Sequence, residues 1–173
     1  LSKTKKLGVE IYADIFGVKA YKIAKKHKLD GYKIHSSDLN NTPLLELLSK
    51  DNKKIFLAIG GSTILEITNA LEILNKNNNQ KEIILMHGFQ SYPTAIEDSN
   101  LNRLKILKDL FNSEIKIGYS DHVSGEDNFA TILPILALPY DISYIEKHVT
   151  FDRKKKGVDY YSSYEPVEFK KFV

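Results

Sequence analysis

The chain has 173 residues, 42% of them hydrophobic and 27% charged, which suits one globular domain with a real core and is too short for two ordinary domains. It contains no cysteine, so disulfides and thiolate metal sites are excluded, and any metal must be held by nitrogen and oxygen ligands. The net charge of +3 comes from basic and acidic residues spread along the chain, with no aromatic residues interleaved among the basic clusters, and this argues against a nucleic-acid partner.

The amino end lacks the order of a signal peptide, and no apolar run approaches the roughly 18 residues needed to cross a bilayer. A cytoplasmic protein with no membrane partner is therefore expected. Because the first residue is Leu1 rather than Met, we expect the chain to be processed or to be part of a longer polypeptide.

Short runs rich in β-formers recur along the chain and are separated by stretches with helical spacing. This alternation predicts a parallel sheet joined by crossover helices. The predicted strands are Val9 to Ala13, Gly31 to His35, Lys54 to Ile59, Glu82 to His87, Ile115 to Tyr119 and Ile142 to His148.

The clearest predicted helix is the apolar stripe from Ile64 to Leu74, whose start is marked by Thr63 and Glu66 at capping-box spacing, with a break at 77–79. A second stripe runs from Leu101 to Leu110 and is expected to end near Asn112. The remaining predicted helices are Val18 to Lys28, Pro43 to Lys50, Phe129 to Leu138, where Pro134 should kink the helix or mark its first turn, and Glu165 to Val173.

Six strands in repeats of this kind fit either an open doubly wound sheet or part of an eight-unit barrel, and the pattern alone does not choose between them. The first predicted strand is followed by Phe16-Gly17-Val18, which has one glycine where a dinucleotide fingerprint needs three. Nucleotide binding is thereby disfavoured, and the barrel is the better interpretation.

Polar side chains gather at the carboxyl ends of the predicted strands, where the loops of either architecture surround one mouth. Strand alternation puts Lys33 and His35 on one face of their strand and Glu146 and His148 on one face of theirs. A hydrogen-bonded structural histidine is the commoner explanation for any single histidine. His122 and His148, however, end consecutive strands, and as a pair they favour a ligand-binding site.

Several strings, in order and at matching spacing over nearly the whole chain, carry a resemblance to a known family. They are Tyr32-Lys33-Ile34 with Ser36, Tyr92-Pro93-Thr94 followed by Glu97-Asp98, Gly118-Tyr119-Ser120-Asp121-His122, Glu146-Lys147-His148 with Thr150, Asp152 and Arg153, Gly157 with Asp159, and Ser163-Tyr164-Glu165-Pro166 with Glu168-Phe169. With them the chain resembles the N-acetylneuraminate (sialic acid) synthases, including the synthases of related nonulosonic acids.

The resemblance implies an α/β fold, a (β/α)8 TIM barrel of which this chain would supply about six units, units three to eight. Residues 1–173 would then be a single partial catalytic domain, without two amino-terminal strands and without the small carboxyl-terminal antifreeze-like domain of the family. Those regions supply a catalytic glutamate, a lysine and a partner-subunit arginine in the family, so this chain alone is expected to be an incomplete catalyst. A homodimer is expected when the protein is full length.

The implied activity is that of a transferase, which condenses phosphoenolpyruvate with an N-acetylated amino sugar such as N-acetylmannosamine to give a nonulosonic acid and phosphate. By resemblance, His122 and His148 hold a divalent metal, Mn²⁺ before Mg²⁺ or Co²⁺, which polarises the sugar aldehyde. These two histidines and Lys33 are the implied catalytic residues. The implied substrate-binding residues are Lys33, Ser36, Asp38, Gln90, Tyr92, Ser120 and Asp159.

Asp121 and Glu146 are expected to orient the histidines or Lys147 rather than to bind the metal directly, with a helix cap or a structural ion pair as the alternative. His27 is expected at the surface. His87 fits either core packing or pocket lining, and His35 either narrows the pocket or packs.

Four positions depart from the family pattern. Asp14 stands where the family has a phosphate-binding threonine, and Ala58 stands where it has a phosphate-contacting serine. Asp38 and Gln90 replace a glutamate and an asparagine, which are milder changes. The departures leave two alternatives open, a non-catalytic sugar- or phosphate-binding barrel and a metal-dependent pyruvate aldolase that would release no phosphate.

Overall fold

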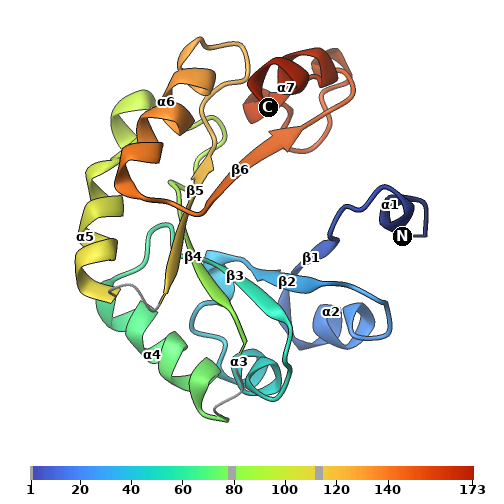
Figure 1. The fold of residues 1–173 in the computed structure, drawn as a ribbon, viewed down its shortest axis with the longest axis vertical. Helices are drawn as coiled ribbons and strands as arrows, with labels where there is room; N and C mark the ends of the chain where they lie inside the picture. Colours follow the sequence, from blue (N-terminus) through green and yellow to red (C-terminus); the bar gives the residue numbers. More distant parts are fainter. Residues whose placement is uncertain (1, 78–80, 112–114) are drawn as a thin grey trace. The chain divides into compact units, whose positions relative to one another are not determined.

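The computed structural model describes residues 2–77, 81–111 and 115–173. The chain divides into two compact units, unit 1 from Leu1 to Leu85 and unit 2 from Met86 to Val173, and each is described by itself (Figure 1). In both, β-strands alternate with helices along the chain. The predicted α/β class is confirmed.

Unit 1 carries three parallel strands in chain order, with β1 paired to β2 and β2 paired to β3. Helix α2 packs on β1, and α3 packs on both α2 and α4. Its helices and strands are α1 (Ser2–Lys6), β1 (Tyr12–Ile15), α2 (Gly17–Ala24), β2 (Gly31–Ile34), the 3-10 turn η1 (Ser36–Asp38), α3 (Thr42–Ser49), β3 (Lys54–Ala58) and α4 (Ile64–Asn75).

Unit 2 repeats this arrangement, with β5 paired in parallel to β6 and β6 paired to β7. Helices α5 and α6 both contact β5 and lie along one side of it in Figure 1. Strand β4 (Ile83–His87) crosses the boundary between the units. The others are η2 (Ile96–Ser99), α5 (Asn102–Phe111), β5 (Lys116–Asp121), α6 (Phe129–Ala137), η4 (Leu138–Tyr140), β6 (Tyr144–Val149), η5 (Arg153–Lys155), η6 (Tyr160–Ser162), β7 (Ser163–Tyr164) and α7 (Pro166–Phe172).

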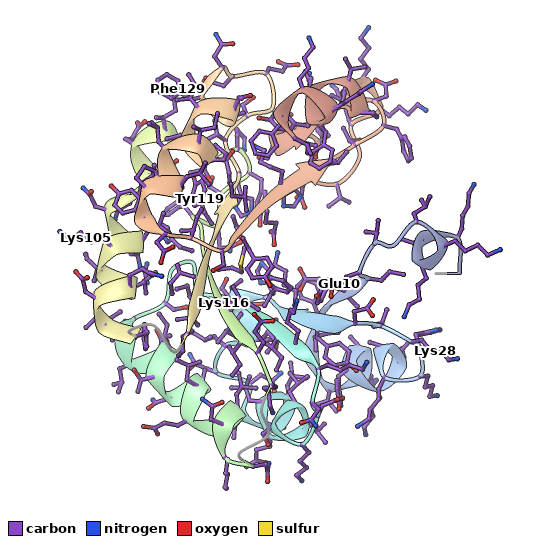
Figure 2. All side chains as sticks on the ribbon, viewed as in Figure 1. Glu10, Lys28, Lys105, Lys116, Tyr119 and Phe129 are labelled. Carbon is purple, nitrogen blue, oxygen red and sulfur yellow. The ribbon has the colours of Figure 1, made fainter. Side chains whose placement is uncertain are left out.

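Apolar periodicity explains which face of each helix is buried. In α5 the side chains of Leu104 and Leu107 are fully buried, whereas Lys105 extends away from the strands (Figure 2). In α4 the capping box predicted at Thr63 is present, because its hydroxyl accepts from the Glu66 amide while the Glu66 carboxylate accepts from the Thr63 amide.

All six predicted strands are present, with shifted ends. The first begins at Tyr12 rather than Val9, because the amide of Ile11 donates to the Asp30 carboxylate instead of joining a ladder. The fifth runs on to Asp121, two residues beyond the predicted end. A seventh strand, β7, was not predicted. The predicted breaks at Asn112 and at 78–79 lie outside the described residues.

Pro134 lies inside α6 rather than in its first turn. A proline has no N–H, so the helix lacks the hydrogen bond that would run from position 134 to the carbonyl of Ala130. Among the described residues, no helix is long and apolar enough to cross a lipid bilayer.

Candidate functional site

His122 lies one residue beyond β5 in unit 2 and is only 2% exposed. Its Nδ1 lies 2.8 Å from the carbonyl oxygen of Phe89, and because that oxygen can only accept, the proton is assigned to Nδ1. The lone pair is then on Nε2. That atom is buried and has no hydrogen-bond partner among the residues that the structure describes, so it is available to a ligand.

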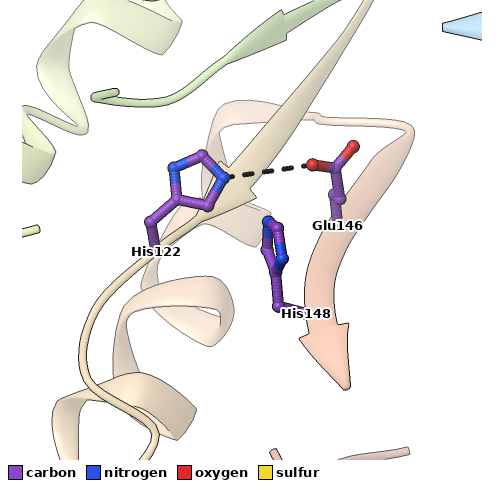
Figure 3. Close-up of side chains that lie close together, drawn as sticks. All are labelled: His122, Glu146 and His148. Atoms are coloured by element: carbon purple, nitrogen blue, oxygen red, sulfur yellow. Dashed lines mark ion pairs between the residues drawn. The ribbon is translucent and has the colours of Figure 1, made fainter. Parts of the chain in front are cut away.

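Two further side chains that could bind a metal, both from β6, approach this nitrogen (Figure 3). Oε1 of Glu146 lies 4.0 Å from His122 Nε2, and the His148 ring centroid lies 5.2 Å from that of His122. One ligand atom from each of the three residues lies within 4.8 Å of the others. Two imidazoles and one carboxylate are a donor set that suits a divalent transition metal, and the orphaned buried nitrogen of His122 fits such an ion.

The backbone at His122 is fixed from two sides. Its carbonyl oxygen accepts from the amide of Thr94 at 2.8 Å and from the hydroxyl of Ser162 at 2.6 Å. Thr94 also forms an isolated parallel bridge with Val123. With the ring held at Nδ1 as well, His122 has little freedom to turn away from the other donors.

Asp159 lies beside the second histidine. Its Oδ2 is 3.6 Å from Nδ1 of His148, and its backbone has a left-handed φ of 55°. The hydroxyl of Ser163 donates to the Asp159 carbonyl at 2.9 Å and fixes this turn. A carboxylate near Nδ1 is a common way to orient a metal-binding imidazole. Asp159, predicted as a sugar contact, is thus placed at the donor group.

Tyr92 forms an aromatic wall against both histidines. Its ring centroid lies 4.4 Å from that of His122 and 5.5 Å from that of His148. Its hydroxyl donates to Oε1 of Gln90 at 2.9 Å, so two predicted substrate-binding side chains are held together. Ser120 is 4% exposed, and its hydroxyl has no partner among the described residues. A buried orphan hydroxyl of this kind is a candidate ligand contact.

The other predicted residues lie in unit 1. Lys33 and Asp14 are register partners on β2 and β1, and Lys33 Nζ lies 3.6 Å from Asp14 Oδ2. Asp38 accepts from the Gly17 amide at 2.7 Å and from the Asn41 side chain at 2.8 Å. The lysine charge is therefore already engaged by a carboxylate, and Asp38 joins two loops of this unit.

Ser36 begins η1, which His35 caps by accepting from the Ser37 amide at 3.2 Å. His35 therefore has a structural contact. Ala58 ends β3 with 2% exposure and offers no side-chain hydrogen bond. His27 is exposed, as predicted.

His87 is 3% exposed, and its Nε2 lies 3.1 Å from both the Ser99 and the Asn100 carbonyl oxygens. Burial lowers the pKa of this imidazole below its ordinary value, so a neutral ring donating to these carbonyls is favoured. His87 thus ties η2 to the end of β4. This is a packing contact, whereas the buried Nδ1 of His87 has no partner among the described residues and is, like the Ser120 hydroxyl, a candidate ligand contact.

Asp121 and Lys147 form a buried ion pair, and their side chains are 0% and 1% exposed. Contact with Lys147 is one of the roles expected for Asp121 from the sequence. Burial lowers the pKa of Lys147, and the nearby Asp121 carboxylate opposes that shift.

The sequence did not indicate two features of the site. The first is the distance between Glu146 and His122. Glu146 was expected to orient the histidines or Lys147, and its spacing of two from His148 gave their shared face, but neither gave the 4.0 Å between its Oε1 and His122 Nε2. The second is the Phe89 carbonyl as the acceptor for His122. Every residue has a backbone carbonyl, so the residue type gives no signal for this contact.

The model of the NeuB family matches residues 1–173. An uncharacterized protein of Methanocaldococcus jannaschii is 39% identical over 168 residues, which is 97% of this chain and 48% of that protein. The N,N'-diacetyllegionaminic acid synthase of Campylobacter jejuni is 33% identical over 167 residues, or 96% of this chain and 48% of the enzyme. The chain thus spans about half the length of the curated relatives it matches.

Among solved structures, the N-acetylneuraminic acid (sialic acid) synthetase of Leptospira borgpetersenii, in complex with citrate, matches with a TM-score of 0.87 and 33% identity. The match covers 99% of this chain and 57% of that one. The resemblance drawn from the sequence strings is thereby confirmed, and the chain belongs to the NeuB family.

Proposed function

We propose that this chain is the metal-carrying part of a nonulosonic acid synthase, a transferase that condenses phosphoenolpyruvate with an N-acetylated amino sugar such as N-acetylmannosamine and releases phosphate. The observation that carries the proposal is the group formed by His122, Glu146 and His148, with the orphaned Nε2 of His122 directed toward Glu146. Named synthases of this kind among the relatives support it.

His122 and His148 would hold the metal, for which Mn²⁺ is the first choice and Mg²⁺ or Co²⁺ the alternatives, with Glu146 as a third donor or as a base for a bound water. When bound, such a metal supplies Lewis-acid polarisation of the sugar aldehyde. Glu146 thereby gains a role nearer the metal than the supporting one that the sequence indicates.

The chain's own residues bind and orient the substrates. Tyr92 and Asp159, which flank the two histidines, would contact the amino sugar. Gln90, which the Tyr92 hydroxyl holds in place, would contact phosphoenolpyruvate. The buried hydroxyl of Ser120 would donate to phosphoenolpyruvate. In unit 1, Lys33 and Ser36 are assigned to phosphoenolpyruvate by family resemblance, and Asp38 is assigned more generally to substrate binding.

The remaining parts of the proposal concern the whole protein. The chain would form most of an eight-unit barrel, with one strand more than the six expected of units three to eight because β7 is present. The full-length protein would be a cytoplasmic homodimer with no nucleic-acid or membrane partner. The family match over the whole chain and the TM-score of 0.87 support the barrel.

A second candidate function is a barrel that binds sugar or phosphate without turnover. The ion pair between Asp14 and Lys33 favours it, because a phosphate would have to displace a carboxylate to reach the lysine charge. The Asp14→Asn substitution separates the candidates. If the protein is a synthase, this variant should lower the KM for phosphoenolpyruvate, whereas a non-catalytic barrel would show no turnover in either form.

The main test is release of inorganic phosphate from phosphoenolpyruvate by the full-length protein of which this chain is expected to be a part. Release should require both Mn²⁺ and an N-acetylated amino sugar, and a chelator should abolish it. His122→Ala should abolish it too, while His27→Ala, a matched change at an exposed histidine, should leave it intact. Absence of phosphate release with every hexosamine tried would refute the synthase, and turnover of pyruvate without phosphate release would indicate an aldolase.

A further inference from the structure

Strands β5 and β6 carry two different sets of side chains on their two faces. The strands pair in parallel with Ser120 opposite Glu146 and Asp121 opposite Lys147. Because side chains alternate along a strand, Glu146 and His148 share one face of β6 and Lys147 points to the other. Lys147 and its register partner Asp121 therefore belong to the side of the sheet opposite the candidate metal ligands.

On that opposite side, the ammonium group of Lys147 is surrounded by three partners. Besides its contact with Asp121, it donates to the carbonyl of Ala130 at 3.2 Å and lies 4.3 Å from the centre of the Tyr164 ring. The Ala130 carbonyl is free to accept because Pro134, four residues later, has no N–H to offer it. The proline inside α6 thus supplies the lysine with an acceptor.

Asp121 uses both of its oxygens. Oδ2 binds Lys147, and Oδ1 accepts from the Tyr119 hydroxyl and from the amide of Val123, each at 3.3 Å. The carboxylate therefore holds residues on both sides of His122, whose ring is directed to the donor group. At the other end, Lys147 lies between Glu146 and His148 in the chain.

We propose that the buried pair of Asp121 and Lys147 is a positioning device, which fixes the end of β5 against β6 so that His122, Glu146 and His148 converge on one metal ion. The inference rests on the proposed metal-binding function and adds two positioning residues to it. Neither side chain belongs to the candidate metal group. They act through the backbone neighbours of the ligands.

An ion pair suits this task better than apolar packing does. Apolar contacts are non-directional and tolerate small slips between strands. A buried carboxylate and ammonium that are fully surrounded by directional partners accept only one arrangement, because any slip leaves a buried charge without its partner.

The test compares Mn²⁺ affinity, measured by electron paramagnetic resonance of the free ion, with the thermal stability of the metal-free protein. The double variant Asp121→Leu/Lys147→Met removes the pair without leaving a buried charge, and the exchange of such a pair for apolar side chains is often neutral for stability. We expect its metal-free melting temperature to stay near that of the parent and its Mn²⁺ dissociation constant to rise at least about tenfold.

Lys147→Arg keeps the charge and the partner and should retain most of the affinity, as a rescue by the conservative change. Lys108→Met removes the exposed ion pair with Asp141 and should leave the affinity unchanged. A folded double variant that binds Mn²⁺ within twofold of the parent would overturn the positioning role alone. A parent protein that binds no Mn²⁺ would overturn both this role and the proposed metal site.

Discussion

Gly88→Ala should damage the proposed metal site without changing any of its proposed ligands. A Cβ added at Gly88 would lie 2.5 Å from the carbonyl oxygen of Ser120 and 2.9 Å from its Cβ. Ordinary contacts begin at 3.4 Å, so the segment after β4 must move away from β5 by about 0.9 Å. Both neighbouring atoms belong to the backbone or to its first side-chain carbon, and neither can rotate aside.

The displacement reaches the site through the next residue. The Phe89 carbonyl, which follows Gly88, accepts from His122 Nδ1 at 2.8 Å. If the whole displacement of about 0.9 Å reaches Phe89, the distance from its carbonyl oxygen to His122 Nδ1 grows to about 3.7 Å and the hydrogen bond is lost. Overpacking of this kind costs about 1–3 kcal/mol, or a fall in melting temperature of about 2–12 °C for a chain of this size. Loss of the contact that orients His122 should weaken Mn²⁺ binding about tenfold or more.

The assay is thermal unfolding with and without Mn²⁺, together with a Mn²⁺ titration. Gly157→Ala is the matched control, because a Cβ there would meet no heavy atom within 4 Å, and it should change neither value. A Gly88→Ala protein that is less stable but binds Mn²⁺ normally would refute the link from Phe89 to His122. Unchanged stability would show that the approach of Gly88 to Ser120 is looser than the structure has it.

Three further outcomes are expected. On the proposed function, Tyr92→Phe keeps the ring against the histidines but removes the hydroxyl that holds Gln90, so the KM of the full-length protein for phosphoenolpyruvate should rise about tenfold in steady-state assays while Mn²⁺ affinity is unchanged. Burial lowers the pKa of His87 below 6.5, so the folded protein binds fewer protons than the unfolded one and loses stability as the pH falls below 6.5; urea unfolding of His87→Asn should lack this slope. The Arg153 guanidinium lowers the pKa of Glu168 below 4.5, so this pair stabilises the fold above pH 4.5 and less as the pH falls through the folded pKa. Because Glu168 is partly exposed, Glu168→Gln should cost only about 0.5–1 kcal/mol near neutral pH and nothing in acid.

Local signals explain which elements could be predicted from the sequence. Helix α4 begins where its capping box places it, because Thr63 and Glu66 satisfy each other's backbone amides within one turn. Strand β7 could not be found this way, since Ser163 and Tyr164 are two residues whose extended form depends on pairing with His148 and Val149 of β6. The end of β5 was misjudged for a similar reason, because the polar residues after Tyr119 look like a loop until their pairing with β6 is known.

The candidate site likewise contains residues that local sequence patterns could indicate and contacts that they could not. The sequence could indicate His122 and His148 because parallel strands bring their carboxyl ends to one edge, and that rule needs no knowledge of side-chain partners. It could not supply the acceptor at Phe89, the approach of Asp159 to His148, or the pairing of Asp14 with Lys33. These contacts depend on loop paths and rotamers, which tertiary packing decides.

The alternation of side chains on β5 and β6 also divides each of the two polar strings between the two faces of the sheet. In Glu146-Lys147-His148 the outer residues belong to the candidate metal group, and the middle one belongs to the buried pair behind the sheet. In Ser120-Asp121-His122 the aspartate likewise serves the pair, while its neighbours present an orphan hydroxyl and an orphan imidazole nitrogen. The effect of a substitution in either string should therefore depend on whether it changes the middle residue or one of the two outer residues. Changes at the middle positions should alter metal affinity by moving the proposed ligands, whereas changes at the outer positions should remove proposed ligands or substrate contacts directly.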